Sequence, residues 1–278
     1  MTFAQKLENI GDKNNSLLCV GLDSRFEKLQ KAFQKKDYPQ FAFNKWIIEQ
    51  THDLVCAYKP NTAFYEERGA DGITELKMTC HYLVKYYPEI PIILDAKRGD
   101  IGSTNEGYVK FAFTYLSADA ITLHPYLGKE ALRPFLDQKE KGCIILCKTS
   151  NPGSGEFQDI SIDPPFEGGA QRAEDENKLY KTVAQSVVKK WNSNGNCMLV
   201  VGATYPKELA EVRKIVGDIT LLIPGIGAQG GDIGKTLQAG LNSKGAGMII
   251  NSSRGIIFSK DPREEAKKLR ENINKYRS

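Results

Sequence analysis

Asp95, Lys97 and Asp100 place an acid, a base and an acid within six residues of the sequence ILDAKRGDIGSTN. Asp95 and Lys97 are two residues apart, so on a strand their side chains point to the same face. Asp100 is expected at the start of the following helix, where Thr104 would lie beside it. A buried lysine between two carboxylates stays protonated, because nearby negative charge favours the ammonium form, and it can then donate a proton to a strong base. The same pattern is also typical of an internal salt-bridge network and of a carboxylate metal site.

Two segments near the C-terminus have the composition of an anion site. PGIGAQGGD, at residues 224–232, is rich in small residues that let backbone N–H groups approach an anion closely. NSSRG, at residues 251–255, contains Arg254, whose guanidinium is a forked cationic donor. Loops after the seventh and eighth strands of a barrel recurrently bind phosphate, so the two segments together predict a phosphate site. The alternative is two ordinary turns and a surface arginine.

Short apolar runs predict the strands that position these residues. Each run has Val, Ile, Leu or Cys without polar alternation, as strands buried on both faces do. The runs are residues 17–23, 54–60, 90–97, 118–125, 142–150, 196–204, 218–227 and 245–255. Nearly all end in polar residues, namely Asp23, Lys59, Asp95 with Lys97, His124, Lys148 with Ser150, Thr204, and Ser253 with Arg254. Polar groups gathered at one rim are typical of an enzyme barrel.

Stretches with helical spacing separate the apolar runs. They are residues 41–55, 73–87, 105–116, 177–191, 206–216 and 232–241, and a last stretch at 262–276 opens with Pro262 and acids. Eight strands alternating with helices predict an α/β protein with the (β/α)₈ TIM-barrel fold, in one domain spanning residues 1–278. An open doubly wound sheet is the alternative; the first strand is followed by no GxGxxG motif, which makes a dinucleotide-binding form of that fold less favoured.

Residues 151–177 interrupt this alternation. The segment directly follows the fifth predicted strand and is rich in Gly, Pro, Asp and Ser. Structureless loops of this length in compact domains are often lids, or else disordered. We therefore expect a lid loop at 151–177.

Composition limits the classes of partner. The chain has 278 residues, 38 basic and 34 acidic, with a net charge of +4, which is too small and too mixed to favour nucleic-acid binding but is compatible with a small anionic substrate. No apolar run approaches the ~20 residues of a transmembrane helix, and the polar start lacks the apolar stretch of a secretory signal. A cytoplasmic protein without membrane contact is expected, and its six cysteines are expected to be buried and free of disulfides.

Five segments in a fixed order carry a resemblance to a known family. CVGLD, AYKPNTAFYE, DAKRGDIGSTN, PGIGAQGGD and NSSRG follow one another from near residue 20 to near residue 254. In this order they resemble the orotidine 5′-phosphate decarboxylase family, and its longer bacterial branch in particular. The resemblance implies a homodimeric barrel that uses neither metal nor organic cofactor. It also implies conversion of orotidine monophosphate to uridine monophosphate and CO₂, the last step of de novo pyrimidine synthesis.

The resemblance assigns the reacting groups to the first cluster. Lys97 matches the proton donor to C6 of the pyrimidine, flanked by Asp95 and by the partner subunit's Asp100. Lys59 completes the alternating charges. Loss of CO₂ from a ring carbon leaves a poorly delocalised carbanion, so an enzyme without a cofactor must supply fixed positive charge and a proton there. A lysine held by Asp95 and Asp100 would supply both.

The resemblance assigns the remaining site residues to substrate binding. Asp23, with Lys59, matches a residue that holds ribose hydroxyls, and the partner subunit's Thr104 would also reach the ribose. Ser150 matches the residue that contacts the pyrimidine edge, and Gln229 the glutamine that links base and phosphate. Arg254 matches the phosphate arginine, with Ser253 beside it as a further substrate-binding residue. NSSRG departs from shorter relatives, which often have glycine before the arginine, so the details of the phosphate contacts are open.

Two other functions fit parts of the sequence. A magnesium-dependent decarboxylase or aldolase of keto-sugar phosphates would use the same D-x-K-x-x-D pattern on the same barrel. A non-catalytic barrel that binds nucleotides is the second alternative, and it predicts a missing charge in the array, whereas Lys59, Asp95, Lys97 and Asp100 are all present.

Overall fold

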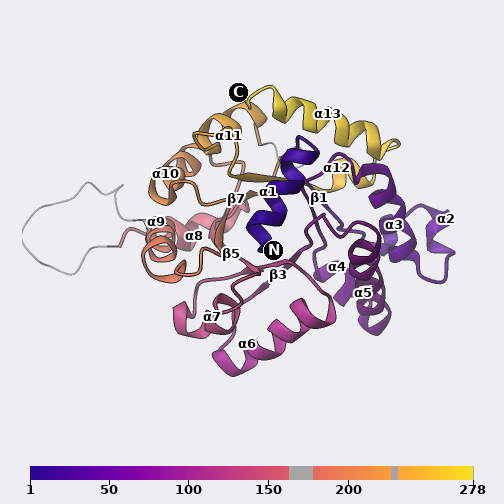
Figure 1. Ribbon diagram of the computed structural model, residues 1–278, viewed down its shortest axis with the longest axis horizontal. Helices are drawn as coiled ribbons and strands as arrows, with labels where there is room; N and C mark the ends of the chain where they lie inside the picture. Colours follow the sequence, from indigo (N-terminus) through magenta and orange to yellow (C-terminus); the bar gives the residue numbers. More distant parts are fainter. Residues whose placement is uncertain (163–177, 227–230, 278) are drawn as a thin grey trace, which may run out of the picture.

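Eight parallel strands of the described chain form a nearly closed barrel surrounded by helices (Figure 1). The computed structural model describes residues 1–162, 178–226 and 231–277. The strands are β1 (Leu18–Gly21), β2 (Ala57–Lys59), β3 (Ile93–Arg98), β4 (Ala120–Leu123), β5 (Gly142–Lys148), β6 (Cys197–Val201), β7 (Leu221–Ile223) and β8 (Met248–Ser252). They pair in the order β2-β1-β8-β7-β6-β5-β4-β3. The predicted single-domain TIM barrel is confirmed.

The strands at the two ends of this order meet through isolated bridges. Tyr58 pairs with Ile92, and Asn61 pairs with Asp95. The backbone N–H of Asp95 also donates to the carbonyl oxygen of Pro60 at 2.9 Å. This closure places the carboxyl end of β2 beside β3, the next strand of the chain after α4 and α5.

The strands form where the apolar runs predict them. Each lies inside one predicted run, except that β3 extends one residue further, to Arg98. β1, β4, β6, β7 and β8 are buried along their whole length, because helices cover the outside of the barrel and side chains fill its interior. The core of the domain is therefore the barrel and the inner faces of its helices.

Helices occupy all seven predicted stretches. The α-helices are α1 (Phe3–Lys13), α2 (Lys31–Gln34), α3 (Pro39–Thr51), α4 (Ala63–Glu66), α5 (Gly69–Tyr86), α6 (Gly102–Val109), α7 (Gly128–Leu136), α8 (Gly155–Gln158), α9 (Leu179–Ser186), α10 (Pro206–Val216), α11 (Ile233–Gly240), α12 (Arg254–Ile257) and α13 (Pro262–Asn274). Short 3₁₀ turns are η1 (Phe26–Lys28) and η3 (Pro152–Ser154), and π-helical turns η2 (Lys110–Tyr115) and η4 (Val187–Trp191) continue α6 and α9. Local caps explain some helix starts: Asp261 accepts from the N–H of Glu264 at 3.0 Å, directly before Pro262.

Six described helices have no counterpart among the predicted stretches: the four-residue helices α2, α4, α8 and α12, and the longer α1 and α7. α7 is short and contains Pro134, which weakens a helical pattern. α1 lies over the amino ends of the strands, at the centre of the view in Figure 1. There the N–H of Phe3 donates to the carbonyl of Glu140 at 2.8 Å, and Lys6 pairs with Asp119 at 2.8 Å. α1 therefore covers the end of the barrel opposite the strands' carboxyl ends.

The segment after β5 is not structureless over its described part. Residues 152–158 form η3 and α8, and Ser161 bridges to Lys178. The described part of the expected lid loop therefore contains two short helical turns. Residues 163–177 of the predicted lid lie outside the described chain, so the lid remains a prediction.

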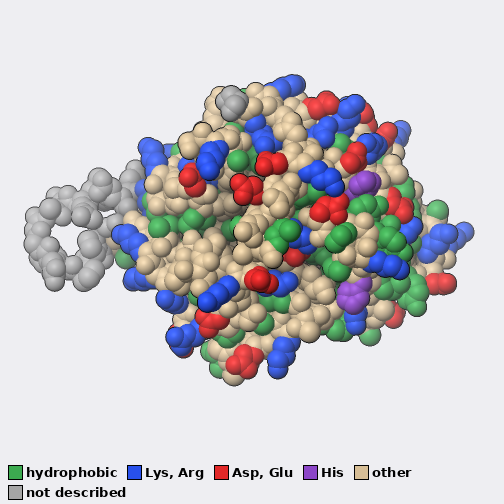
Figure 2. Space-filling model, viewed as in Figure 1, with side chains coloured by type: hydrophobic (Ala, Val, Ile, Leu, Met, Phe, Trp, Pro, Cys, Tyr) green, Lys and Arg blue, Asp and Glu red, His purple; other side chains and the backbone are tan. Residues whose placement is uncertain are grey.

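Surface and cysteine features agree with the composition. Lys and Arg are interspersed with Asp and Glu over the face shown in Figure 2. No described helix combines the length and the hydropathy needed to cross a bilayer. All six cysteines are buried and free, as predicted.

Candidate active site

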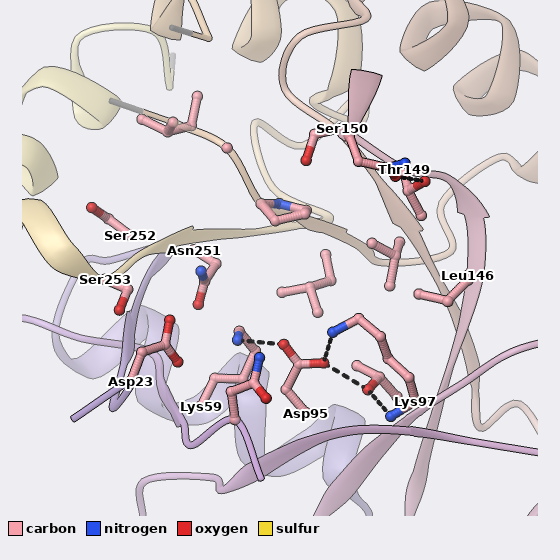
Figure 3. A pocket seen from close by; sticks show the side chains of 18 of the residues that line it. Asp23, Lys59, Asp95, Lys97, Leu146, Thr149, Ser150, Asn251, Ser252 and Ser253 are labelled. Carbon is pink, nitrogen blue, oxygen red and sulfur yellow. Dashed lines mark hydrogen bonds and ion pairs between the residues drawn. The ribbon is translucent and has the colours of Figure 1, made fainter. Parts of the chain in front are cut away.

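A cavity of about 480 Å³ opens at the carboxyl ends of the strands (Figure 3). Side chains from every strand, or from the loop directly after it, contribute to its wall. Seven of the ten predicted site residues line it, namely Asp23, Lys59, Asp95, Lys97, Ser150, Ser253 and Arg254. The barrel therefore brings together at one rim residues that are distant in sequence.

Asp95 lies between two ammonium groups at the centre of the cavity wall (Figure 3). Lys59 Nζ is 2.8 Å from Asp95 Oδ2, and Lys97 Nζ is 2.6 Å from Asp95 Oδ1. Asp95 and Lys97 share the interior face of β3, as their spacing predicts, and Lys59 reaches them because β2 and β3 close the barrel. The result is a fixed cation–anion–cation row.

The charges of Lys59 and Asp95 stabilise each other. Burial alone would lower the pKa of Lys59, but the carboxylates of Asp95 and Asp23 outweigh it and raise that pKa above its usual range. Burial likewise opposes ionisation of Asp95, but Lys59 and Lys97 together hold the pKa of its carboxyl well below the usual range. Both groups therefore remain ionised around neutral pH, inside a largely apolar barrel.

Thr122 of β4 fixes the geometry of this row. Its hydroxyl donates to Asp95 Oδ1 at 2.9 Å and accepts from the backbone N–H of Lys97 at 3.0 Å. Lys97 has a left-handed backbone with φ of +47°, which is a strained conformation for a residue with a side chain. The strained residue is thus the one whose ammonium group contacts Asp95, and the fold holds it in this conformation at an energetic cost.

Asp100 and Thr104 do not reach the cavity within one chain. α6 begins only at Gly102, so the expectation that Asp100 stands on that helix beside Thr104 is wrong. Asp100 Oδ1 instead accepts from the backbone N–H of Ile101 at 2.6 Å. Both side chains are exposed. Within one chain the Lys97 side chain is also 49% exposed, and among the described residues its ion pair is with Asp95, so it is less enclosed than the sequence predicts.

The predicted phosphate residues surround one end of the cavity. Ser253 follows β8 and donates from its hydroxyl to the carbonyl of Gly21 at 3.0 Å, and Arg254 begins α12. Gly225, in the segment after β7, has φ of +99°, a conformation that favours glycine. Gln229 lies outside the described residues, since 227–230 are not described.

The opposite wall is built from the segment after β5. Ser150 lines the cavity, and Gln158 of α8 accepts from the N–H of Thr149 at 2.9 Å and donates to its hydroxyl at 2.8 Å. The Lys148 side chain is fully buried, with its ammonium group 2.8 and 2.7 Å from the two carboxylate oxygens of Asp159. Two adjacent residues of the segment are thus tied back to the end of β5: Gln158 binds Thr149, directly after the strand, and Asp159 pairs with Lys148.

Comparisons with known proteins agree with this geometry. Residues 16–269 match the model of the family described as orotidine 5′-phosphate decarboxylase / HUMPS. The chain belongs to this family. It is 46% identical to an orotidine 5′-phosphate decarboxylase of Cellvibrio japonicus, over 99% of this chain and 98% of the relative. A protein of the same name from Janthinobacterium is 44% identical, over 99% of each chain. The solved structure of Leishmania donovani OMP decarboxylase superposes with a TM-score of 0.87 at 41% identity, covering 100% of this chain and 99% of that one.

Membership of the decarboxylase family confirms the resemblance stated from the five sequence segments. The matched range contains all ten predicted site residues, including Gln229. The two bacterial relatives are matched over nearly their whole length, in agreement with the resemblance to the longer bacterial branch.

The described cavity wall also contains seven polar residues that were not predicted from the sequence, namely Asn61, Thr122, Thr149, Asn151, Gln158, Asn251 and Ser252. Thr122 and Asn251 lie on strands, and Gln158 lies on α8. A threonine inside the apolar run ADAITLHP is a weak signal that one side chain faces a polar interior. Asn251 belongs to the NSSRG segment, where only the serine and the arginine were singled out.

The described residues contain no group of three or more His, Cys, Asp or Glu side chains placed to bind a metal ion. The side chains that line the cavity can supply charge stabilisation at Lys59 and Lys97, a proton from Lys97, and a cationic hydrogen-bond donor at Arg254.

Proposed function

We propose that the protein decarboxylates orotidine monophosphate to uridine monophosphate and CO₂. One observation carries the proposal: the row Lys59–Asp95–Lys97, with contacts of 2.8 and 2.6 Å, lines the cavity at the catalytic end of the barrel. The relatives named above carry this activity in their names, and the family match supports it for this chain. On this basis the protein is a carboxy-lyase of the last step of pyrimidine nucleotide synthesis, working in the cytoplasm.

The reaction proposed at this row needs only charge and a proton. The bond between C6 and the carboxylate carbon breaks, CO₂ leaves, and the electron pair remains on C6. The ammonium group of Lys97 stabilises that developing charge and then transfers its proton to C6. Asp95 keeps Lys97 oriented and protonated, and Lys59 balances the charge of Asp95. The proposed reaction uses neither metal nor organic cofactor.

The remaining side chains are proposed to position the nucleotide. Arg254 and Ser253, with Gln229, would bind the phosphate, at the end of the cavity away from Lys97. Asp23 would bind a ribose hydroxyl, and Ser150 the pyrimidine edge. Binding energy from the remote phosphate can then lower the barrier at C6.

We further propose that the active form is a homodimer in which each cavity is completed by the partner. The half-exposed Lys97 side chain and the exposed Asp100 and Thr104 side chains support this proposal. The partner subunit's Asp100 would lie near Lys97, and the partner subunit's Thr104 would reach the ribose. The approach of a second chain would also exclude water from Lys97.

Turnover of orotidine monophosphate tests the function directly. Purified protein should convert the ultraviolet spectrum of orotidine monophosphate into that of uridine monophosphate and release one CO₂ per uridine monophosphate formed, before and after treatment with EDTA. Activity on a keto-sugar phosphate that EDTA removes would favour the magnesium-dependent alternative. Tight nucleotide binding without any turnover would favour the non-catalytic barrel.

A further inference from the structure

Asn251 is a buried amide in the wall of the cavity that none of the proposed roles uses. It lies on β8, where it pairs in register with Cys19 of β1, and it is 8% exposed. Its side chain lines the cavity, yet its Oδ1 atom is buried and accepts no hydrogen bond from any described residue. The neighbouring β8 residues Ile249 and Ile250 are apolar, as expected of a strand in a barrel wall.

An unpartnered buried carbonyl oxygen is costly to the free protein. It loses its hydrogen bonds to bulk water and gains none in return, whereas an apolar residue of the same shape would avoid the loss. Such a group is rare enough in folded proteins that each case calls for an explanation, and a ligand that supplies the missing donor is one. At this position the ligand would be whatever fills the cavity.

A second acceptor in the same state lies close by. Asp23 Oδ1 is also buried without a hydrogen-bond partner among the described residues. Asp23 and Asn251 both line the cavity, and in the view of Figure 3 both appear on its side with Lys59 and Ser253. Gly21 makes room for this arrangement, because a Cβ there would lie 3.4 Å from Asn251 Oδ1 and 2.8 Å from Ser253 Cβ. The cavity wall thus holds two buried oxygen acceptors that have no partner among the described residues.

The chemistry of the two acceptors selects one part of a nucleotide. A phosphate carries only acceptors, and it would be repelled by Asp23. The pyrimidine is assigned to Ser150 and Lys97, across the cavity. A ribose offers neutral hydroxyl donors, and it must lie between the base and the phosphate near Ser253 and Arg254. Hydroxyl groups are therefore the donors that fit beside Asp23.

We propose that Asn251 is a further substrate-binding residue, whose Oδ1 accepts a hydrogen bond from a ribose hydroxyl next to the one bound by Asp23. This inference rests on the proposed function, since it takes the ligand to be a pyrimidine nucleotide. It adds to the site a residue that selects ribose over deoxyribose at one hydroxyl position.

A binding cycle tests the proposal. Uridine monophosphate, its 2′-deoxy form and its 3′-deoxy form are titrated calorimetrically into the wild type and into Asn251→Leu. One missing hydroxyl should weaken binding to the wild type about tenfold, the value of one buried hydrogen bond. Asn251→Leu should bind uridine monophosphate about tenfold more weakly and should no longer distinguish it from that one deoxy form.

Two variants make the outcome decisive. Asn196→Leu removes another buried amide, whose Oδ1 has no partner among the described residues. It lies before β6, at the opposite end of the barrel, and the variant should leave the discrimination between the three nucleotides unchanged. Asn251→Ala, measured in parallel, replaces Asn251→Leu if leucine does not pack.

Equal weakening for all three nucleotides, or unchanged affinity for uridine monophosphate, would overturn the assignment of Asn251. A wild type that neither binds uridine monophosphate nor decarboxylates orotidine monophosphate would overturn the proposed function instead.

Discussion

Within a single chain the carboxylate of Asp100 does not contact the ammonium group of Lys97, although only two residues separate them. Asp100 Oδ1 accepts from the N–H of Ile101, and in the described chain the ion pair of Lys97 is with Asp95. β3 and the loop before α6 therefore send the two carboxylates of the D-x-K-x-x-D pattern in different directions. The pattern is complete in sequence, but one chain brings only Asp95 and Lys97 into contact.

Subunit mixing tests whether Asp100 acts on a partner's Lys97. Lys97→Ala and Asp100→Asn chains are each expected to be inactive. Mixed in equal amounts and allowed to exchange, they should recover roughly a quarter of wild-type activity, because half of the dimers are mixed and each mixed dimer has one native site. The measurement is decarboxylation of orotidine monophosphate after exchange is verified by mass spectrometry. No recovery despite exchange would confine the site to one chain.

Lys97→Ala should reduce turnover of orotidine monophosphate by more than about a thousandfold, because the variant loses both the proton donor and the nearest positive charge. The rate is measured by ultraviolet absorbance, and folding by circular dichroism. Lys189→Ala, which removes an exposed lysine from η4, is the matched control and should keep the wild-type rate. A Lys97→Ala rate within tenfold of the wild type would remove Lys97 from the mechanism.

Arg254→Ala should raise KM for orotidine monophosphate about ten- to a hundredfold, the range expected for a hydrogen bond to a charged group. Arg254 lines the cavity and is assigned to the phosphate, whereas the proposed chemistry takes place at Lys97. Orotidine, which lacks the phosphate, should therefore react equally slowly with the variant and the wild type. Equal impairment with both substrates would contradict a phosphate role.

Asp95 links stability to pH in a defined direction. Its pKa is lower in the folded protein than the ~3.9 of an unfolded aspartate, so its ion pairs stabilise the fold above that value and are lost as the pH falls towards the folded pKa. Lys59 has a raised pKa, so its contribution is present below ~10.4 and is lost only as the pH rises through the folded pKa. The difference in unfolding free energy between the wild type and Asp95→Asn should be constant from about pH 5 to 9 and should shrink below about pH 4. Urea unfolding at several pH values measures it, and a difference that grows on acidification would contradict the assignment.

The Lys148–Asp159 pair makes an asymmetric prediction. Asp159→Asn leaves a fully buried ammonium group without its ionic partner. Breaking a buried ion pair costs ~3–5 kcal/mol, and we expect a loss near the lower end of that range because the Asp159 side chain is 36% exposed. Lys148→Met leaves only that partly exposed carboxylate and should cost less. Chemical unfolding of both variants gives the comparison. Equal losses would mean that burial of Lys148 does not determine the energetics.

The local pattern of the sequence was enough to predict the barrel and the shared face of two residues of the charged row, Asp95 and Lys97. Apolar runs predicted the strands because parallel strands in a barrel are buried on both faces. The spacing of Asp95 and Lys97 predicted a shared face because side chains alternate along a strand. Polar residues at the ends of the runs predicted the rim, since the carboxyl ends of parallel strands meet at one end of the barrel.

Only the tertiary structure decided which of these groups touch. Lys59 contacts Asp95 because the barrel closes between β2 and β3, and Thr122 supports both Asp95 and Lys97 from a neighbouring strand. The direction of Asp100, the buried amide of Asn251 and the pairing of Lys148 with Asp159 depend on strand register and on loop conformation. Such contacts either join residues that are distant in sequence or depend on a single backbone angle. Neither kind of contact leaves a periodic pattern in the sequence.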